Sequence, residues 1–158
     1  MKLMMNIQNN GIEITDPKFP DDATLSNDTR KSFVLKGEHK RKWTAENPNN
    51  HIGIRLEIDG KLIKSKEINK CDGGLLVDDN RLYLVEFKGQ NYEKAAEQLI
   101  KTKDHFKLNY KNYNFIFHAR IIGKSFPKAS TNKQNAMLKL KSHFSTFLPF
   151  ETEGTENI

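Results

Sequence analysis

The segment Cys71–Gly89, which reads CDGGLLVDDNRLYLVEFKG, contains the pattern that most restricts how this chain folds. Successive side chains of a β-strand point to opposite faces, and apolar residues occupy both faces in the middle of Leu82–Phe87. A strand of this kind belongs in the centre of a sheet that is covered on both sides. Gly73–Val77, which precedes it across a short polar turn, predicts the neighbouring strand of a hairpin.

The patterns on either side of this hairpin predict helices and further strands. Apolar residues at helical spacing indicate helices, and alternating apolar residues followed by Asp-Gly indicate a second hairpin. The expected elements are a helix at Lys31–Glu46 that stops before Pro48, a hairpin at Ile52–Ile63, strands at Gly73–Val77 and Leu82–Phe87, a helix capped by Asn91, a buried strand ending at Gly123, and a helix from about Thr131 to Phe147.

The length of 158 residues suits one domain, which we expect to have a terminal segment on each side. Residues 1–28 are polar and weakly periodic, so we expect an irregular arm with one short strand at Gly11–Thr15. Residues 29–148 predict an α/β domain, a mixed central sheet flanked by helices. Residues 149–158 are expected to form a flexible acidic tail.

Positive charge is unevenly distributed along the chain, whose net charge is +6. Residues 101–141 hold ten basic residues and one acidic residue, Asp104. Such a stretch is typical of a surface that binds a polyanion, but a solvated face that keeps the protein soluble has the same composition. The basic cluster Gly37–Trp43 also has two interpretations. It binds phosphates and stacks a base on Trp43, or it is an exposed face of a helix.

Cysteine content and hydropathy restrict the metal chemistry and the compartment. The single cysteine, Cys71, cannot form an internal disulfide or a cysteine-based zinc or iron–sulfur site within one chain. No apolar run reaches the length of a membrane span, and the start of the sequence, MKLMMNIQNN, lacks a signal-peptide pattern. We therefore expect a cytoplasmic protein that does not bind membranes.

The central strand ends with two charged residues that continue one of its apolar rows. Leu82, Leu84, Glu86 and Lys88 point to the same face. A buried charge must be paired, bound to a metal or neutralised. An ion pair between Glu86 and Lys88 is one explanation, although nothing about the end of a core strand requires a charged pair.

Asp72 joins this face only in certain registers of the hairpin. A two-residue turn at Asp79-Asn80 would point its carboxylate away from Glu86. A three-residue loop at Asp79–Arg81, or a one-residue bulge at Gly73-Gly74, would place it on the same face as Glu86. We predict that the hairpin uses one of these two devices.

Asp72, a short hairpin and the triplet Glu86-Phe87-Lys88 resemble the motif of the PD-(D/E)XK nuclease superfamily, which has the restriction-endonuclease-like fold. The resemblance covers about Ile54–Ile122, under half of the chain, with strands, helix and strand in the order of the superfamily core. It implies that Asp72 and Glu86 bind a divalent metal, helped by the Phe87 carbonyl. It also implies that Lys88 contacts the attacking water or the scissile phosphate.

The resemblance implies two further site residues and has two departures. Many members carry a glutamine in the following helix, where Gln98 lies on the flank of the apolar face. Many also carry an acid in the preceding helix, for which Glu38 and Glu46 are candidates and Glu38 is preferred. Cys71 stands where proline is common, and Gly73-Gly74 replaces an apolar pair.

The residue types suit phosphodiester cleavage on chemical grounds too. The reaction needs a hard cation that polarises a phosphoryl oxygen and activates water. Mg²⁺ prefers one or two carboxylates and several waters, which Asp72 and Glu86 would provide, and Mn²⁺ is expected to substitute. Lys88, beside two acids, should stay protonated and stabilise charge that develops in the transition state.

These observations predict a Mg²⁺-dependent endonuclease acting on DNA. We expect contacts to the nucleic-acid backbone from the basic region, namely from Lys101, Lys124, Lys128 and Lys133. The small size is similar to that of Holliday junction resolvases, which work as homodimers, and it is compatible with a restriction, repair or mobile-element nuclease.

Two alternatives of another class stay open. One is a non-catalytic nucleic-acid- or protein-binding module that keeps the same fold, in which Glu86 and Lys88 form only a salt bridge. The other is an immunity or inhibitor protein, whose basic face would meet an acidic partner.

Overall fold

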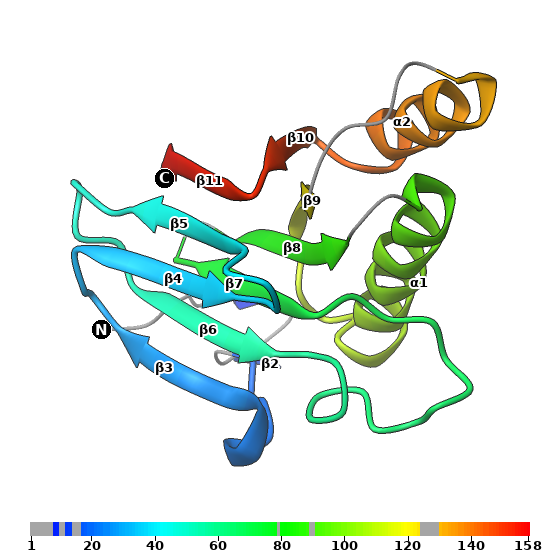
Figure 1. Ribbon diagram of the computed structural model, residues 1–158. Helices are drawn as coiled ribbons and strands as arrows, with labels where there is room; N and C mark the ends of the chain where they lie inside the picture. The colour runs from blue at the N-terminus through cyan, green and yellow to red at the C-terminus, as the bar shows by residue number, and fades with distance from the viewer. Residues whose placement is uncertain (1–7, 10–11, 14–16, 79, 89–90, 124–129) are drawn as a thin grey trace.

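The computed structural model describes residues 8–9, 12–13, 17–78, 80–88, 91–123 and 130–158 (Figure 1). Its elements are β1 (Gln8–Asn9), β2 (Ile12–Glu13), the short 3-10 helix η1 (Asp21–Ala23), β3 (Thr24–Asp28), β4 (Ser32–Lys36), β5 (Lys42–Glu46), β6 (Gly53–Glu57), β7 (Gly73–Val77), β8 (Arg81–Lys88), α1 (Tyr92–Asn109), β9 (Ile116–Gly123), α2 (Thr131–His143), β10 (Thr146–Glu151) and β11 (Glu153–Asn157). Neither helix of this part of the chain is long and apolar enough to cross a membrane.

A six-stranded mixed sheet in the order β10-β9-β8-β7-β6-β3 organises the fold. Strands β6, β7 and β8 are antiparallel neighbours, whereas β9 runs parallel to β8 and β10 runs parallel to β9. Helices α1 and α2 make these two parallel connections. The predicted α/β class and the interior position of the strand at Leu82–Phe87 are thereby confirmed.

Both helices pack on one face of the sheet. The predicted cap of α1 is confirmed, because Asn91 Oδ1 accepts a hydrogen bond of 3.0 Å from the Lys94 amide. The core on this face is built from apolar side chains of the sheet and of both helices, among them Leu56, Leu84, Leu99, Phe106, Ile121 and Leu140.

The other face of the sheet is covered by a three-stranded sheet, β11-β5-β4, and not by a helix. The predicted helix at Lys31–Glu46 is therefore wrong. Phe33, Leu35, Trp43 and Ala45 are buried and alternate with more exposed residues, which is the period of a strand. The charged turn between the two strands hid this alternation.

The C-terminal residues form strands, so the prediction of a flexible tail at 149–158 is wrong. β10 is an edge strand of the main sheet, and β11 pairs with β5 in the small sheet. The helix predicted from Thr131 to Phe147 also ends earlier than expected, at His143. Glu156 of β11 explains why the acidic segment is ordered, because its carboxylate accepts hydrogen bonds from the buried side chains of Arg120 and Trp43.

Two predictions for the first half of the chain hold in part. The turn at Asp59-Gly60 exists, with Gly60 at φ +80°, but β6 pairs with β7 and β3 instead of with the residues after the turn. The N-terminal arm is not wholly irregular, since β3 forms an edge of the main sheet. β2 falls within the predicted strand Gly11–Thr15, whose other residues lie outside the described ranges.

Candidate active site

The register of the β7–β8 hairpin decides where Asp72 points. Val77 pairs with Arg81 and Gly73 pairs with Val85, so three residues separate the two strands and the ladder has no bulge. The loop has the predicted length but starts one residue earlier than predicted. Moving the loop by one residue changes the pairing by two, so Asp72 still falls on the face of Glu86.

Asp72 is fixed from both sides by main-chain groups. Its Oδ2 accepts a hydrogen bond of 2.8 Å from the Phe87 amide, and its carbonyl accepts one of 3.0 Å from the Ile58 amide. The preceding residue is held to α1, because the Cys71 amide donates to Thr102 Oγ1 at 2.8 Å. Asp72 is therefore held by β8 through its carboxylate, by the residue that follows β6 through its carbonyl, and by α1 through the preceding amide.

Glu86 is a buried acid that its surroundings satisfy only in part. Its side chain is 2% exposed. One oxygen, Oε1, lies 3.9 Å from Lys88 Nζ, while Oε2 is buried and has no hydrogen-bond partner among the described residues. The ion pair that would explain both residues structurally is long, and it leaves one buried oxygen unsatisfied.

Burial and a neighbouring acid hold a proton on this site. Burial raises the pKa of Glu86 to about 9, and the negative charge of Asp72 adds to the shift more than the positive charge of Lys88 offsets it. The pKa of Asp72 is raised as well, again mainly by burial. With this proton in place the charges of Asp72 and Lys88 balance, so a bound cation would have to replace the Glu86 proton.

These residues line one cleft of about 920 Å³. Asp72, Glu86, Lys88, Gln98 and Glu38, the five residues that the sequence predicted to be catalytic, all lie on its wall. Strands β4, β6 and β8 run toward the same end of the molecule, the side on which α1 lies in Figure 1. The cleft therefore forms where strand ends, a helix and a turn meet.

Gln98 and Glu38 reach the cleft by different routes. Gln98 Nε2 donates a 3.1 Å hydrogen bond to the Lys70 carbonyl, while its Oε1 is buried without a partner among the described residues. Glu38 lies exposed in the β4–β5 turn rather than on the helix that we had expected. Glu46, the other candidate, instead accepts a hydrogen bond from Ser32 and is absent from the cleft wall.

The donor set fits a hard divalent cation. The described residues contain no group of three or more His, Cys, Asp or Glu side chains arranged to hold a metal, so a cation here would take its charged ligands from the pair Asp72 and Glu86. Mg²⁺ needs no more than one or two carboxylates, and it takes neutral oxygens and water for the rest. The unsatisfied oxygens Glu86 Oε2 and Gln98 Oε1, with the Phe87 carbonyl, are ligands of this type.

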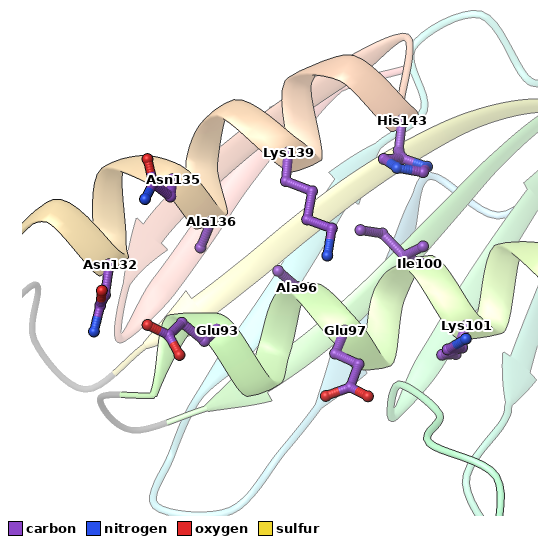
Figure 2. Close-up of a pocket in the computed structure, with 10 residues that line it drawn as sticks. All are labelled: Glu93, Ala96, Glu97, Ile100, Lys101, Asn132, Asn135, Ala136, Lys139 and His143. Carbon is purple, nitrogen blue, oxygen red and sulfur yellow. The ribbon is translucent and has the colours of Figure 1, made fainter.

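Lys101 and Lys133, two of the four lysines predicted to contact nucleic acid, do not line this cleft. Lys101 lines a second cavity of about 600 Å³ between α1 and α2, into which Lys139 extends in Figure 2. Lys133 lies on α2 with its Nζ 5.3 Å from the centre of the Tyr92 ring. Lys124 and Lys128 fall outside the described residues.

Basic residues from the β4–β5 hairpin and β6 line the cleft instead. They are Lys36, Arg41 and Arg55, and the sequence analysis assigned none of them to the site. The signal was present in the basic cluster Gly37–Trp43, for which phosphate binding was one interpretation and an exposed helix face the other. Trp43 itself is fully buried and donates to Glu156 Oε2 at 2.9 Å, so the idea that it stacks a base is wrong.

Comparisons with models of protein families, with curated proteins and with solved structures find no match to this chain.

Proposed function

We propose that this protein is a Mg²⁺-dependent nuclease that hydrolyses phosphodiester bonds of DNA. One observation carries the proposal: Glu86 is buried in an open cleft with an unsatisfied oxygen, beside a second acid and one lysine. A paired structural charge would have no reason to be left in this state. The element order β6, β7, β8, α1, β9 supports a restriction-endonuclease-like core.

The proposal gives each residue of the cleft a role. Asp72, Glu86 and the Phe87 carbonyl would hold the cation, which when bound would polarise a phosphoryl oxygen and activate water. Lys88 would stabilise negative charge on the phosphate as it reacts. Gln98 would position a ligand through its free oxygen. Glu38, on the exposed turn, would approach the substrate from the opposite wall.

Protonation of Glu86 sets a condition for the reaction. Because its pKa is about 9, Glu86 carries a proton at neutral pH when no cation is bound. Binding of Mg²⁺ must displace this proton, so uptake should release it to solvent and should strengthen as the pH rises. Calorimetry in two buffers of different ionisation enthalpy would measure the released proton.

The test compares two matched aspartates of the β7–β8 hairpin. Asp72 lies at the cleft, whereas Asp78, at the opposite end of β7, accepts from His51 Nδ1 at 2.8 Å. Supercoiled plasmid, branched DNA and RNA are incubated with Mg²⁺, Mn²⁺ or chelator. We expect Asp72→Asn and Glu86→Gln to lose about 100-fold or more of the cleavage, and Asp78→Asn to keep it.

Cleavage that survives in both Asp72→Asn and Glu86→Gln would remove this cleft from the mechanism. Lys88→Ala should also lose most activity, but it should retain Mg²⁺ uptake because both carboxylates remain. The similarity in size to Holliday junction resolvases makes a homodimer possible for this protein too, and analytical ultracentrifugation of the wild type would test for one.

The Glu86–Lys88 ion pair of 3.9 Å favours a second candidate, a non-catalytic binding module of the same architecture. That module would bind nucleic acid in a salt-sensitive manner and cleave none of the substrates. An immunity or inhibitor protein would bind an acidic protein tightly and leave nucleic acid unbound.

A further inference from the structure

Arg41 occupies a place in the cleft that the chemistry of the carboxylates does not explain. Its side chain is about nine-tenths buried, with 9% exposed, and it lines the same cavity as Asp72 and Glu86. Its Nε is buried without a hydrogen-bond partner, and no hydrogen bond or ion pair to this side chain occurs within the described residues. The cleft therefore contains a buried cation that lacks an anion.

Each of the other buried or half-buried arginines among the described residues makes at least one side-chain hydrogen bond, including Arg81, whose Nη1 donates to Tyr83 Oη at 3.1 Å although its Nε is buried without a hydrogen-bond partner. Arg120 is 3% exposed and makes two hydrogen bonds to the Glu156 carboxylate. Arg55, which lines the cleft beside Arg41, donates to Ser26 Oγ at 2.7 Å and to the Val34 carbonyl at 2.9 Å. A buried guanidinium without partners is costly, so Arg41 stands out as a group whose partner comes from outside the chain.

The backbone holds Arg41 against the strand that carries Glu86. The Arg41 amide donates to the Glu38 carbonyl at 3.2 Å, and the Arg41 carbonyl accepts from the Gly37 amide at 2.9 Å. The turn packs directly on Phe87, because a Cβ added at Gly37 would overlap the Phe87 ring. Arg41 is therefore fixed relative to the carboxylates rather than carried on a free loop.

We infer that Arg41 binds a phosphate group of a nucleic-acid backbone, adjacent to the phosphate that the carboxylate side of the cleft would receive. A guanidinium presents a planar set of donors that matches phosphate oxygens, and burial strengthens the contact. Glu38, Glu57 and Asp59 also line the cleft, so the cavity is not uniformly positive and Arg41 marks one position on its wall. The identity of the ligand as nucleic acid rests on the proposed function.

The experiment measures binding separately from cleavage. Fluorescently labelled single-stranded and duplex oligonucleotides, as DNA and as RNA of one sequence, are titrated with protein in chelator. Arg41→Met keeps the length of the side chain and removes the charge. Lys42→Met is the matched control, since Lys42 is the next residue, lies 3.8 Å from the exposed Glu153 and is absent from the cleft wall.

We expect Arg41→Met to weaken binding about tenfold or more and to reduce the salt dependence by about one phosphate contact. Lys42→Met should change binding less than about twofold. Arg41→Lys keeps the charge but loses the fork of donors, so it should fall between wild type and Arg41→Met. It also provides the result if Arg41→Met does not fold, which circular dichroism would reveal.

The outcomes separate this inference from the proposed function. Equal effects of Arg41→Met and Lys42→Met on binding would overturn the role of Arg41. If Arg41→Met fails to fold, unchanged binding by Arg41→Lys would overturn it instead. In either case, loss of cleavage in Asp72→Asn would still support the nuclease. Weaker binding by Arg41→Met with no cleavage by wild type would keep the phosphate site and reject the nuclease. If the wild type binds none of the oligonucleotides, both are rejected.

Discussion

Two clusters of buried charge in this protein are built in opposite ways. In the first, Arg120 and Glu156 form two hydrogen bonds of 2.6 and 2.8 Å, and Arg120 Nη1 also donates to the Ala119 carbonyl and to Thr146 Oγ1. In the second, Glu86 has a lysine at 3.9 Å, a neighbouring acid and a buried oxygen without a partner among the described residues. We refer to them as the paired cluster and the open cluster.

The difference follows from where the clusters lie. The paired cluster joins the main sheet to β11 of the small sheet, and Trp43 completes it by donating to Glu156. The open cluster lies at a strand end and faces a cleft of about 920 Å³. Charged side chains that only join two sheets can be fully paired with each other inside the protein. Charged side chains of a binding site must keep some of their hydrogen-bonding groups unpaired until a ligand binds.

The largest effect should come from breaking the paired cluster. Glu156→Ala leaves the buried Arg120 guanidinium without its anion, so we expect the free energy of unfolding to fall by about 3–5 kcal/mol. Glu153→Ala, on the same strand, removes only an exposed partner of Lys42 at 3.8 Å and should cost about 1 kcal/mol or less. Urea unfolding of both variants measures the contrast, and equal losses would contradict it.

The open cluster should respond in the opposite direction when its acid is neutralised. The pKa of Glu86 is about 9 in the folded state against 4.5 for a free side chain, so the folded protein binds this proton more tightly. Its contribution to stability is then present below pH 4.5 and is lost as the pH rises toward 9. Without metal at pH 8, Glu86→Gln should therefore raise the free energy of unfolding by about 2–4 kcal/mol.

Urea unfolding in chelator between pH 5 and 9 checks this sign (~0.5 pH steps suffice). Wild type should lose stability over the range, and Glu86→Gln should show a much flatter profile. A loss of stability in Glu86→Gln comparable with that of Glu156→Ala would mean that the two clusters do not differ in kind.

A divalent cation should convert the open cluster into a satisfied one. We expect Mg²⁺ in excess to stabilise wild type by about 1–3 kcal/mol through binding to the folded state alone. The gain should be larger at pH 8 than at pH 6, because releasing the Glu86 proton costs less free energy at the higher pH, and it should vanish in Asp72→Asn and Glu86→Gln. Thermal unfolding with Mg²⁺, and again after addition of chelator, measures it; a gain retained in both variants would place the metal elsewhere.

The sequence indicated the open cluster well because its geometry is set by neighbouring residues. Side chains alternate along β8, and a loop with an odd number of residues places Asp72 on the same face of the hairpin as Glu86. This holds even though the three-residue loop starts one residue away from the expected position. The helix that carries Gln98 was equally readable from its N-cap and its apolar spacing. The roles of these residues stay predictions.

The paired cluster could not be inferred from the sequence because its partners are far apart in the chain. Glu156 meets Trp43 across 113 residues and Arg120 across 36. Nothing local in the segment ETEGTENI indicates burial, and Pro149 argues against a strand except at an edge, where β10 lies. Contacts of this kind decided the elements that the sequence analysis assigned wrongly.

Arg41 was not named as a site residue for a related reason, although phosphate binding was one of the two interpretations of its basic cluster, Gly37–Trp43. Its position depends on β4 and β5 pairing with each other and docking on Phe87, which a helix at Lys31–Glu46 would prevent. The alternating burial of Phe33 and Leu35 was visible in the sequence, but the charged turn made the segment resemble an amphipathic helix. Interpreting the apolar spacing of this segment as helical, and not as that of a strand, thus kept Arg41 out of the candidate site.

The smallest predicted effect tests whether backbone strain also distinguishes the two clusters. His39, in the turn that lines the cleft of the open cluster, has φ 57°, and Thr152, between β10 and the strand that carries Glu156 of the paired cluster, has φ 60°. Asparagine tolerates this left-handed conformation better than either residue, and β-branched threonine tolerates it least. We expect Thr152→Asn to raise the free energy of unfolding by about 1 kcal/mol and His39→Asn by about half of that.

Because strain of this kind is local, both gains should persist with and without Mg²⁺ in urea unfolding. A gain at His39 that disappears on adding Mg²⁺ would instead couple the turn to the open cluster, and the two clusters would then differ in backbone as well as in charge.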